Sequence, residues 1–482
     1  MRKCLHSRKE FLRAAALTGV SLGVGPLLAE GRAMAGPAKP NILLIMVDDL
    51  GKEWVGCYGI EGIDTPNVDA LAAGGIRFTN AYSMAQCTPS RATLLTGQYP
   101  YRTGWVNHWD VPRWGVGYFD WRAYTTFATV LKSVGYATAA AGKWQINDFR
   151  IEPHAMRKHG FDDWCLWTGY ETGNPPSAER YWDPYVNTPE GSKTYGGRFG
   201  PDVFTDFLIR FMKDHRDGPM LLYFPMVLTH SPFMTTPDEP EAKGNLARHK
   251  AMVRYADKLV GRLVHALDEL GLRERTIVIF TTDNGSSRRV TGTLHGRKVA
   301  GGKGTERESG VCAPFIVNCP GRVPSGVVSD ALTDFTDLLP TFAELAGAPL
   351  PDGYPLDGIS MASLLLGKAH DSRRDWIMAM GHGPAVRDQA GIRGRTAFMS
   401  RVIRDKRYKV WVDTNRRIER LHDLKHDPDE QNNLLPSGRV EHQAELAKFQ
   451  QLVDAMPAVD ARPRYAPRKP LPWDRPAAEP EN

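Results

Sequence analysis

The sequence predicts an α/β fold, in which a large mixed, mostly parallel sheet lies between helices and is followed by a small α+β subdomain with an antiparallel sheet. Residues 41–47 and 276–282 are uninterrupted apolar runs, typical of strands buried on both faces of a parallel sheet. Each run ends in acidic or amide residues, and open α/β sheets carry their sites at this edge. Residues 401–404 and 408–413 indicate a hairpin of the small sheet.

The length of 482 residues and the hydrophobic content of 42% suffice for one large domain with a smaller one attached. We expect the large domain over residues 38–372, the small subdomain over 373–456 and a Pro- and Arg-rich extended tail over 457–482. The formal net charge is +6, and several of the basic residues lie near the two ends of the chain. This balance does not favour a nucleic-acid partner.

Residues 1–35 have the pattern of an export signal. Basic residues come first, an apolar run follows over 14–29, and Ala33-Met34-Ala35 is a small-residue cleavage site. Residues 7–12 resemble a twin-arginine signal in which a lysine replaces the second arginine. Because the apolar run is short and contains Pro26, we expect no stable membrane insertion and a soluble periplasmic or secreted protein. An uncleaved N-terminal anchor is the alternative.

The chain contains six cysteines, and their spacing predicts neither a disulfide framework nor a zinc site. Cys4 lies in the leader, and Cys87 belongs to a distinct motif. The disulfide pairing of the other four cysteines stays open.

Polar side chains follow both buried runs. Asp48 and Asp49 come after the first run, and Asp283 and Asn284 come after the second. If the two strands are neighbours, three carboxylates and an amide oxygen meet at one edge of the sheet. Such hard oxygen donors suit Ca²⁺ or Mg²⁺. Either pair alone is equally consistent with a solvated turn, but two pairs after buried strands favour a metal site.

The stretch Cys87-Thr88-Pro89-Ser90-Arg91 predicts the start of a helix. Pro89 suits the first helical position, and Gly97 stands where the helix would end. Cys87 would then lie just ahead of a helix N-terminus, so we expect an acidified thiol. Arg91, one turn into the helix, could hold an oxyanion. A small buried cysteine before an ordinary helix is the plain alternative.

The whole string, Cys-x-Pro-Ser-Arg followed by Ala-Thr-Leu-Leu-Thr-Gly over residues 87–97, resembles the signature of the type I sulfatase family. The resemblance extends from about residue 40 to about residue 435. It implies an alkaline-phosphatase-like three-layer sandwich and a sulfuric ester hydrolase. It also implies that a formylglycine-generating enzyme converts Cys87 to Cα-formylglycine, whose hydrate is the nucleophile.

The family's metal ligands fall on the strand-end residues and on the modified cysteine. The resemblance implies that Asp48, Asp49, Cys87, Asp283 and Asn284 bind the cation, which is Ca²⁺ or alternatively Mg²⁺.

Three further motifs match residues that contact sulfate in the family. They are Lys143 in Gly-Lys-Trp, His230 in His-Ser-Pro and Lys303 in Gly-Gly-Lys-Gly. Each is weak by itself, since a lone lysine is usually solvated and a lone histidine is usually a satisfied loop residue. Together, behind the cysteine signature, they imply a sulfate pocket in which Arg91 polarises the nucleophile. His230 or Lys303 would protonate the departing alcohol.

One position departs from the family. Gln145 stands where members commonly carry a histidine that acts as a base, and glutamine cannot accept a proton at neutral pH. His108 and His295 are candidate replacements because they lie near motif segments. With Asp110 and Arg113, they are also candidate substrate contacts at the rim of the pocket.

The substrate is open at this level. Residues 105–121 and 170–185 are rich in aromatic side chains, which stack on sugar rings but also fill cores. These segments and the export signal favour an exported sulfatase that acts on a sulfated saccharide or another sulfate ester. The alternatives are a phosphate or phosphonate monoester hydrolase of the same superfamily and, if Cys87 is not converted, a non-catalytic protein that binds sulfated glycans.

Overall fold

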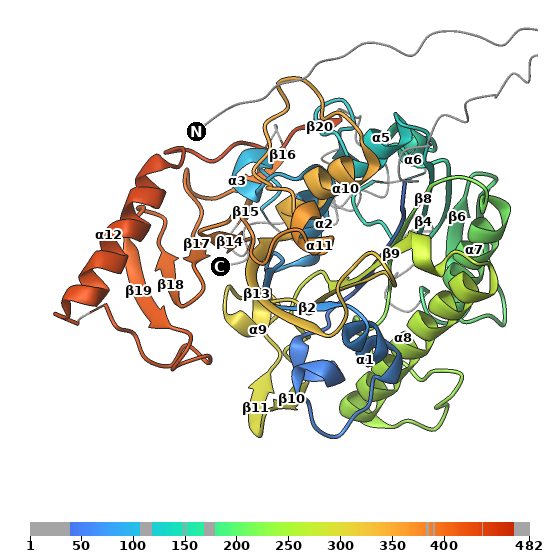
Figure 1. Ribbon diagram of the computed structural model, residues 1–482, viewed down its shortest axis with the longest axis horizontal. Coiled ribbons are helices and arrows are strands. Elements are labelled where there is room, and N and C mark those ends of the chain that lie inside the picture. Colours follow the sequence, from blue (N-terminus) through green and yellow to red (C-terminus); the bar gives the residue numbers. More distant parts are fainter. Residues whose placement is uncertain are drawn as a thin grey trace, which may run out of the picture. The chain divides into compact units, whose positions relative to one another are not determined.

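A ten-stranded mixed sheet forms the centre of the fold (Figure 1). From one edge to the other, its strands are β13 (Val327–Asp334), β2 (Ile76–Tyr82), β12 (Phe315–Asn318), β9 (Thr276–Thr282), β1 (Asn41–Val47), β8 (Met220–Pro225), β4 (Ala137–Lys143), β5 (Asp163–Trp167), β6 (Tyr185–Thr188) and β7 (Gly191–Thr194). The five neighbours from β9 to β5 run parallel, whereas β12, β6 and β7 are antiparallel to their neighbours. The prediction of a large, mostly parallel sheet is therefore confirmed.

The apolar run of β1 serves two cores at once. Its side chains alternate between the faces of the sheet, so that Ile42 and Leu44 belong to one hydrophobic cluster and Leu43 and Ile45 to the other. All seven residues of β1 are buried, as expected for a strand covered on both faces.

Helices cover both faces of the sheet, which gives the predicted three layers (Figure 1). On one face lie α1 (Pro66–Ala73), α7 (Gly200–Asp214) and α8 (Gly244–Glu269). On the other face lie α2 (Cys87–Thr96), α5 (Phe127–Lys132) and α10 (Leu338–Ala346).

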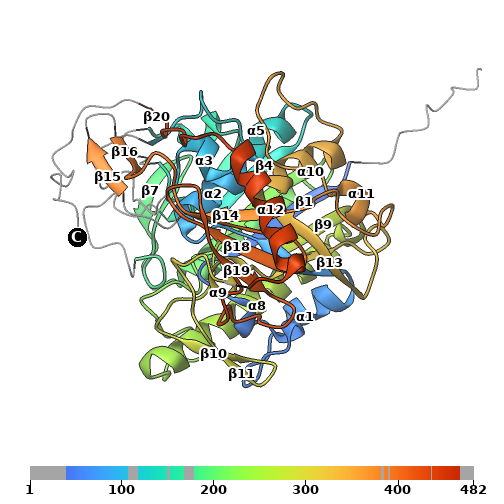
Figure 2. The ribbon, with the colours of Figure 1, turned by 90° about the vertical axis from the view of Figure 1, so that its left-hand side faces the viewer.

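The C-terminal subdomain contains the predicted small antiparallel sheet. Its strand order is β14 (Ile377–Met380), β17 (Arg401–Arg404), β18 (Tyr408–Val412) and β19 (Ile418–Asp423). Strands β17 and β18 form the expected hairpin. Helix α12 (Val440–Ala455) packs on this sheet through Phe449 and Val453 (Figure 2).

Shorter elements connect these layers. They are the strand pairs β10 (Thr291–Leu294) with β11 (Arg297–Ala300), β15 (Ala385–Asp388) with β16 (Gly391–Gly394) and β3 (Tyr118–Phe119) with β20 (Tyr465–Ala466); the helices α3 (Pro100–Thr103), α6 (Ala155–Lys158), α9 (Glu308–Val311) and α11 (Ala362–Leu365); and the 3-10 turns η1 (Lys52–Trp54), η2 (Gly56–Tyr58), η3 (Arg273–Arg275) and η4 (Phe335–Asp337).

Residues 457–466, the start of the predicted tail, run back along the large domain. The backbone N–H of Ala461 donates to the carbonyl of Tyr101, and β20 pairs with β3. Asp460 forms an ion pair with the buried Arg401 at 2.7 Å. This part of the tail is thus bound both to α3 and β3 and to strand β17 of the small sheet.

The structure, a computed structural model, describes residues 39–106, 118–147, 149, 152–167, 179–381, 385–388, 391–435 and 437–466. The predicted export signal and the end of the tail lie outside these residues. Cys57, Cys87, Cys165, Cys312 and Cys319 are all free thiols. Within the described part of the chain, no helix is both long and apolar enough to cross a bilayer.

Candidate active site

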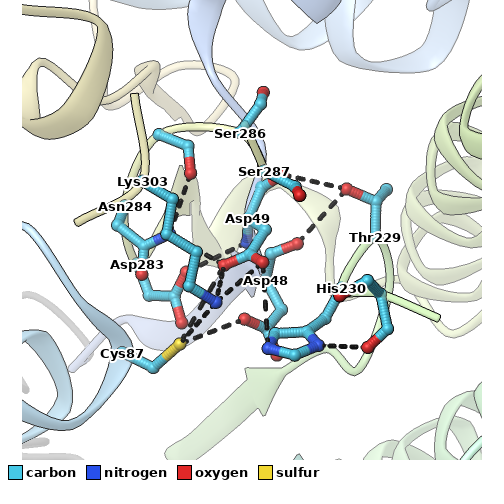
Figure 3. A network of polar contacts seen from close by, with 12 residues as sticks. Asp48, Asp49, Cys87, Thr229, His230, Asp283, Asn284, Ser286, Ser287 and Lys303 are labelled. Atoms are coloured by element: carbon cyan, nitrogen blue, oxygen red, sulfur yellow. Dashed lines mark hydrogen bonds and ion pairs between the residues drawn. The ribbon is translucent and has the colours of Figure 1, made fainter. Parts of the chain in front are cut away.

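The predicted strand-end residues meet at one edge of the sheet because β1 and β9 are adjacent and parallel, with Val47 opposite Thr282. The N–H of Asp49 donates to Oδ1 of Asp283 at 3.1 Å. The amide Nδ2 of Asn284 donates to Oδ1 of Asp49 at 2.8 Å (Figure 3). These side chains are buried, so the fold gathers the carboxylates away from solvent.

Cys87 lies beside these carboxylates, at the start of α2. Its Sγ is 3.5 Å from Oδ1 of Asp48 and 4.0 Å from Oδ1 of Asp49. The helix begins at Cys87 rather than after it, with Gln86 as the N-cap, so Pro89 is its third residue and not its first. Proline is tolerated there because N–H groups in the first turn have no partner within the helix. Gly97 ends the helix at φ 68°, as predicted.

Two lysines approach Cys87 from different parts of the chain. Lys143, the last residue of β4, places Nζ 3.5 Å from Sγ of Cys87 and 2.6 Å from Oδ2 of Asp48. Lys303, in the loop after β11, places Nζ 3.5 Å from the same sulfur and 2.7 Å from Oδ1 of Asp49. Each lysine thus pairs with one of the two adjacent carboxylates, and both reach the cysteine.

Arg91 is buried behind this group. Its Nη1 donates to the carbonyl of Lys143 at 2.6 Å, and its Nη2 donates to Oδ2 of Asp283 at 3.0 Å. These two donors hold Lys143 and Asp283 in place, and the contact of Arg91 with an oxyanion stays a prediction.

The expectation of an acidified thiol is wrong. Burial, and then the carboxylate of Asp283, raise the pKa of Cys87 well above its ordinary value, although Lys143 and Lys303 oppose this. The helix N-terminus favours an anion locally, but desolvation and the carboxylates that the fold brings beside the sulfur outweigh it.

The carboxylates titrate differently from one another. Burial raises the pKa of Asp48, but Lys143, His230 and Arg91 outweigh it and hold that pKa well below its ordinary value. Burial and then Asp48 raise the pKa of Asp283 to about 7, in spite of Arg91. One carboxylate of the cluster is thus strongly anionic and another is easily protonated.

His230 completes the cluster from the loop after β8. Its Nε2 lies 3.8 Å from Oδ2 of Asp49. Burial, followed by the charges of Lys303 and Arg180, lowers the pKa of His230 well below its ordinary value, which keeps the ring neutral. Thr229 supports this loop by donating from Oγ1 to the carbonyl of Asp49 at 3.1 Å (Figure 3).

Arg180 is a site residue that sequence reasoning missed. It is 3% exposed, and its Nη2 lies 3.0 Å from Nδ1 of His230 and 2.8 Å from the carbonyl of Ser231. Its guanidinium also lies 4.6 Å from the ring centre of Trp167. No motif surrounds Arg180 in the sequence, so only its place within an aromatic-rich segment could have drawn attention to it.

The remaining predicted residues fall in different places. Gln145 is half-buried two residues after Lys143 and adopts a positive φ of 73°. His295 lies at the turn between β10 and β11, where its N–H donates to the carbonyl of Gly59, and the structure does not place it among the residues that contact Cys87. His108, Asp110 and Arg113 lie outside the described residues.

The donor atoms at the site fit a hard divalent cation. One ligand atom each from Asp48, Asp49, Cys87 and His230 lie within 4.8 Å of one another. This group includes His230, which was not among the predicted ligands, and does not include Asp283, whose Oδ1 accepts the N–H of Asp49. Oδ1 of Asn284 is buried and has no hydrogen-bond partner among the described residues, which leaves an amide oxygen available as a ligand. Carboxylate and amide oxygens are the ligands of Ca²⁺ and Mg²⁺.

The layered fold and the polar cluster at the carboxyl ends of its parallel strands define a hydrolase of the alkaline-phosphatase-like class. More particularly, the chain belongs to the sulfatase family, and it is a sulfuric ester hydrolase. The sulfatase family model matches residues 40–348. A second model, "N-sulphoglucosamine sulphohydrolase, C-terminal", matches residues 303–455.

Individual relatives agree with this assignment. Human arylsulfatase A is 35% identical over 395 residues, which cover 76% of this chain and 75% of the relative. The N-acetylgalactosamine-6-sulfatase of Canis lupus familiaris is 34% identical over 366 residues, covering 71% of this chain and 69% of the relative. Among solved structures, Ps i-CgsB in complex with k-i-k-neocarrahexaose superimposes with a TM-score of 0.71 at 25% identity, covering 86% of this chain and 93% of that chain.

Proposed function

We propose that this protein is an exported sulfatase that removes sulfate from a sulfated saccharide, with the residue at position 87 as the nucleophile after its conversion to formylglycine. The observation that carries the proposal is the position of Cys87, whose sulfur lies 3.5 Å from both Lys143 Nζ and Lys303 Nζ and beside Asp48. Two cations beside one atom at the edge of a carboxylate cluster suit the negatively charged non-bridging oxygens of a sulfate ester.

The thiol itself is a poor candidate for the nucleophile. Burial raises the pKa of Cys87 well above its ordinary value, so the thiolate is scarce at neutral pH. Formylglycine would supply an oxygen nucleophile at this position, which is the chemistry that the family uses. The sulfur of Cys87 therefore marks the place of that oxygen.

Asp48, Asp49, Asp283 and Asn284 would hold the cation, for which we propose Ca²⁺, with Mg²⁺ as the alternative. When bound, the cation would neutralise charge on the sulfuryl group and increase the acidity of the nucleophile. The buried oxygen atoms of these side chains support this assignment.

Side chains of the protein would bind the sulfate group, donate the proton to the leaving group and hold the site in place. Lys143 and Lys303 would bind the non-bridging oxygens of the sulfate group, since both ammonium groups already face position 87. Lys303 or His230, which both face Asp49, would protonate the departing alcohol; because His230 is held neutral, it would first have to take up a proton. Arg91 would act by holding Asp283 and the end of β4 in place.

Gln145 would orient the nucleophile by a hydrogen bond and would not accept its proton. It lies two residues after Lys143, the last residue of β4, so it is close in sequence to the cluster. The base that releases the sulfate group must then be another residue or solvent.

A saccharide is the substrate class that the comparisons support. The solved structure with the TM-score of 0.71 contains a neocarrahexaose, and a relative that is 34% identical is an N-acetylgalactosamine-6-sulfatase. The predicted export signal agrees with a substrate outside the cytoplasm.

The test begins with the mass of the peptide that contains Cys87, from protein produced together with a formylglycine-generating enzyme. Conversion lowers the mass by about 18 Da relative to cysteine. Converted protein should then release sulfate from sulfated oligosaccharides in the presence of Ca²⁺. Turnover of phosphate or phosphonate monoesters alone would contradict the proposal, and an unmodified thiol with bound glycan would indicate a non-catalytic binding protein.

A further inference from the structure

A buried ionic cluster joins the small C-terminal sheet to the segment that follows Lys303. Lys409 of β18 places Nζ 3.0 Å from Oε1 of Glu308 and 3.0 Å from Oε1 of Glu430. Arg404 of β17 places Nη1 2.9 Å from Oε2 of Glu308. The Lys409 side chain has no exposed surface, and that of Glu430 is 2% exposed. We call these four residues the interdomain cluster.

The interdomain cluster also binds the backbone of the catalytic domain. Nζ of Lys409 donates to the carbonyl of Glu306 at 2.6 Å. Oε2 of Glu430 accepts the N–H of Glu308 at 2.7 Å. The segment from Glu306 to Glu308, which begins three residues after Lys303, is therefore bound by side chains of the C-terminal subdomain, namely those of Lys409 and Glu430.

The other side of the same loop is held by the catalytic domain. The N–H of Lys303 donates to the carbonyl of Ser286 at 3.0 Å, and the N–H of Gly304 donates to the carbonyl of Ala85 at 2.8 Å. A Cβ on Gly302 would approach the side chain of Ser309 to 2.5 Å, so the loop folds tightly against α9. A shift of α9 would therefore be passed on to Lys303.

Buried ion pairs contribute little net stability, because the cost of removing both charges from water offsets their attraction. Buried ion pairs do favour one particular arrangement of their side chains, since displacing one partner leaves the other charge buried and unpaired. We infer that Lys409 is a positioning residue for the reaction: by binding Glu306 and Glu308, it sets Lys303 Nζ at its distance from position 87. This inference rests on the proposed function, in which Lys303 binds the sulfate group.

The test is a double-mutant cycle on formylglycine-containing protein, with Lys409→Met, Lys303→Met and the pair. We expect Lys409→Met to lower kcat/KM roughly 10- to 100-fold, mostly through kcat, because small displacements at a site have effects of that size. In the Lys303→Met background the same change should cause no further loss. Equal losses in both backgrounds would overturn the inference.

A second measurement separates this inference from the proposed function. Hydrogen exchange at the amides of residues 301–307 should become faster in Lys409→Met, with or without turnover. If the wild-type protein cleaves no sulfate ester but this exchange rises, the proposed function fails and the contact between the cluster and the loop stands. Unchanged exchange would overturn the inference.

Arg401→Met is the matched control. Arg401 lies on β17 with no exposed side-chain surface, and it pairs with Asp460 at 2.7 Å; among the described residues no contact links it to the Lys303 loop. It should lower thermal stability but leave kcat unchanged. If Lys409→Met does not fold, Glu430→Gln weakens the same cluster with less disruption, and it should give a smaller loss that again vanishes in the Lys303→Met background.

Discussion

Lys143 and Lys303 lie 160 positions apart in the sequence, yet each places its Nζ atom 3.5 Å from the same sulfur of Cys87. Lys143 is buried at the end of β4, whereas the side chain of Lys303 is 21% exposed in a loop. The buried lysine therefore approaches position 87 from within the sheet, and the partly exposed lysine approaches it from the side of the solvent.

This relationship predicts that both lysines are needed for turnover. Lys143→Met and Lys303→Met should each lower kcat/KM of the converted protein about 100- to 1000-fold, as expected for the loss of one donor to a charged transition state. Steady-state sulfate release measures this. Lys258→Met removes an exposed lysine that pairs with Asp238. It should change kcat/KM less than about twofold, because an exposed ion pair contributes little free energy. Unaffected turnover in either site variant would exclude that lysine from the pocket.

Gln145→His tests what glutamine does at the position where the family commonly carries a base. If Gln145 only orients the nucleophile, histidine supplies the same hydrogen bond and can also accept a proton, so kcat should be similar or higher. Single-turnover and steady-state rates of the converted protein are the measurement. A collapse of activity in a folded variant would show that Gln145 has a specific role that histidine cannot take.

Ca²⁺ should stabilise the protein through the strand-end carboxylates. A ligand that binds only the native state raises its stability by about 2.7 kcal/mol at 100 times its Kd. The melting temperature should therefore rise with Ca²⁺ and fall again with a chelator. Asp49→Asn should remove most of this rise. Asp357→Asn, which changes an aspartate paired with Arg102 outside the cluster, should retain it. An undiminished rise in Asp49→Asn would place the cation elsewhere.

The buried side chain of His249 should make the free energy of unfolding depend on pH. Its ring is buried between Trp54 and Phe233, at 4.5 and 5.0 Å between ring centres, and burial lowers its pKa to about 3. Below pH 6.5 the imidazole of His249 takes up a proton in the unfolded chain but not in the folded chain. The buried neutral ring therefore makes its full contribution to the free energy of unfolding above pH 6.5, and this contribution is lost as the pH falls. The loss amounts to about 2 kcal/mol between pH 8 and pH 5.

Denaturant unfolding of His249→Phe at these two pH values measures that loss directly. The variant should lose less stability on acidification than the wild type. His159, which is also buried and has a pKa of about 4 because of burial, contributes separately, so some pH dependence should persist. A variant with the full wild-type dependence would contradict the assignment to His249.

The parts that could be predicted from sequence depend on local patterns. The apolar runs of β1 and β9 end in acidic residues, so Asp48 and Asp283 were expected to meet if the two strands were neighbours, and the parallel pairing of β1 with β9 meets that condition. The acidity of Cys87 could not be inferred in the same way. The rule for a helix N-terminus is local, whereas burial and the carboxylate of Asp283 come from the tertiary fold.

Arg180 and Lys409 were missed for a similar reason. Neither belongs to a motif, and each contacts a partner that is far away in the chain. Arg180 contacts His230, and Lys409 pairs with Glu308. A single sequence provides no local signal for such pairs. His295 shows the limit of such local reasoning, because it lies near a motif in sequence but at the turn between β10 and β11, where the described residues show no contact between it and Cys87.

The complete burial of Cys87 has a consequence for the order of events in biosynthesis. Its side chain has no exposed surface, and every residue of α2 is buried around it. An enzyme that converts this cysteine, as we propose, could not reach it in the folded protein. We therefore expect the modification to take place on the nascent or unfolded chain, before the C-terminal sheet docks against the turn that precedes Cys87, where the N–H of Ala85 donates to the carbonyl of Met380. If the protein is exported by a route that carries only folded chains, Cys87 would have to be converted before export. The oxidation would then take place on the cytoplasmic side of the membrane.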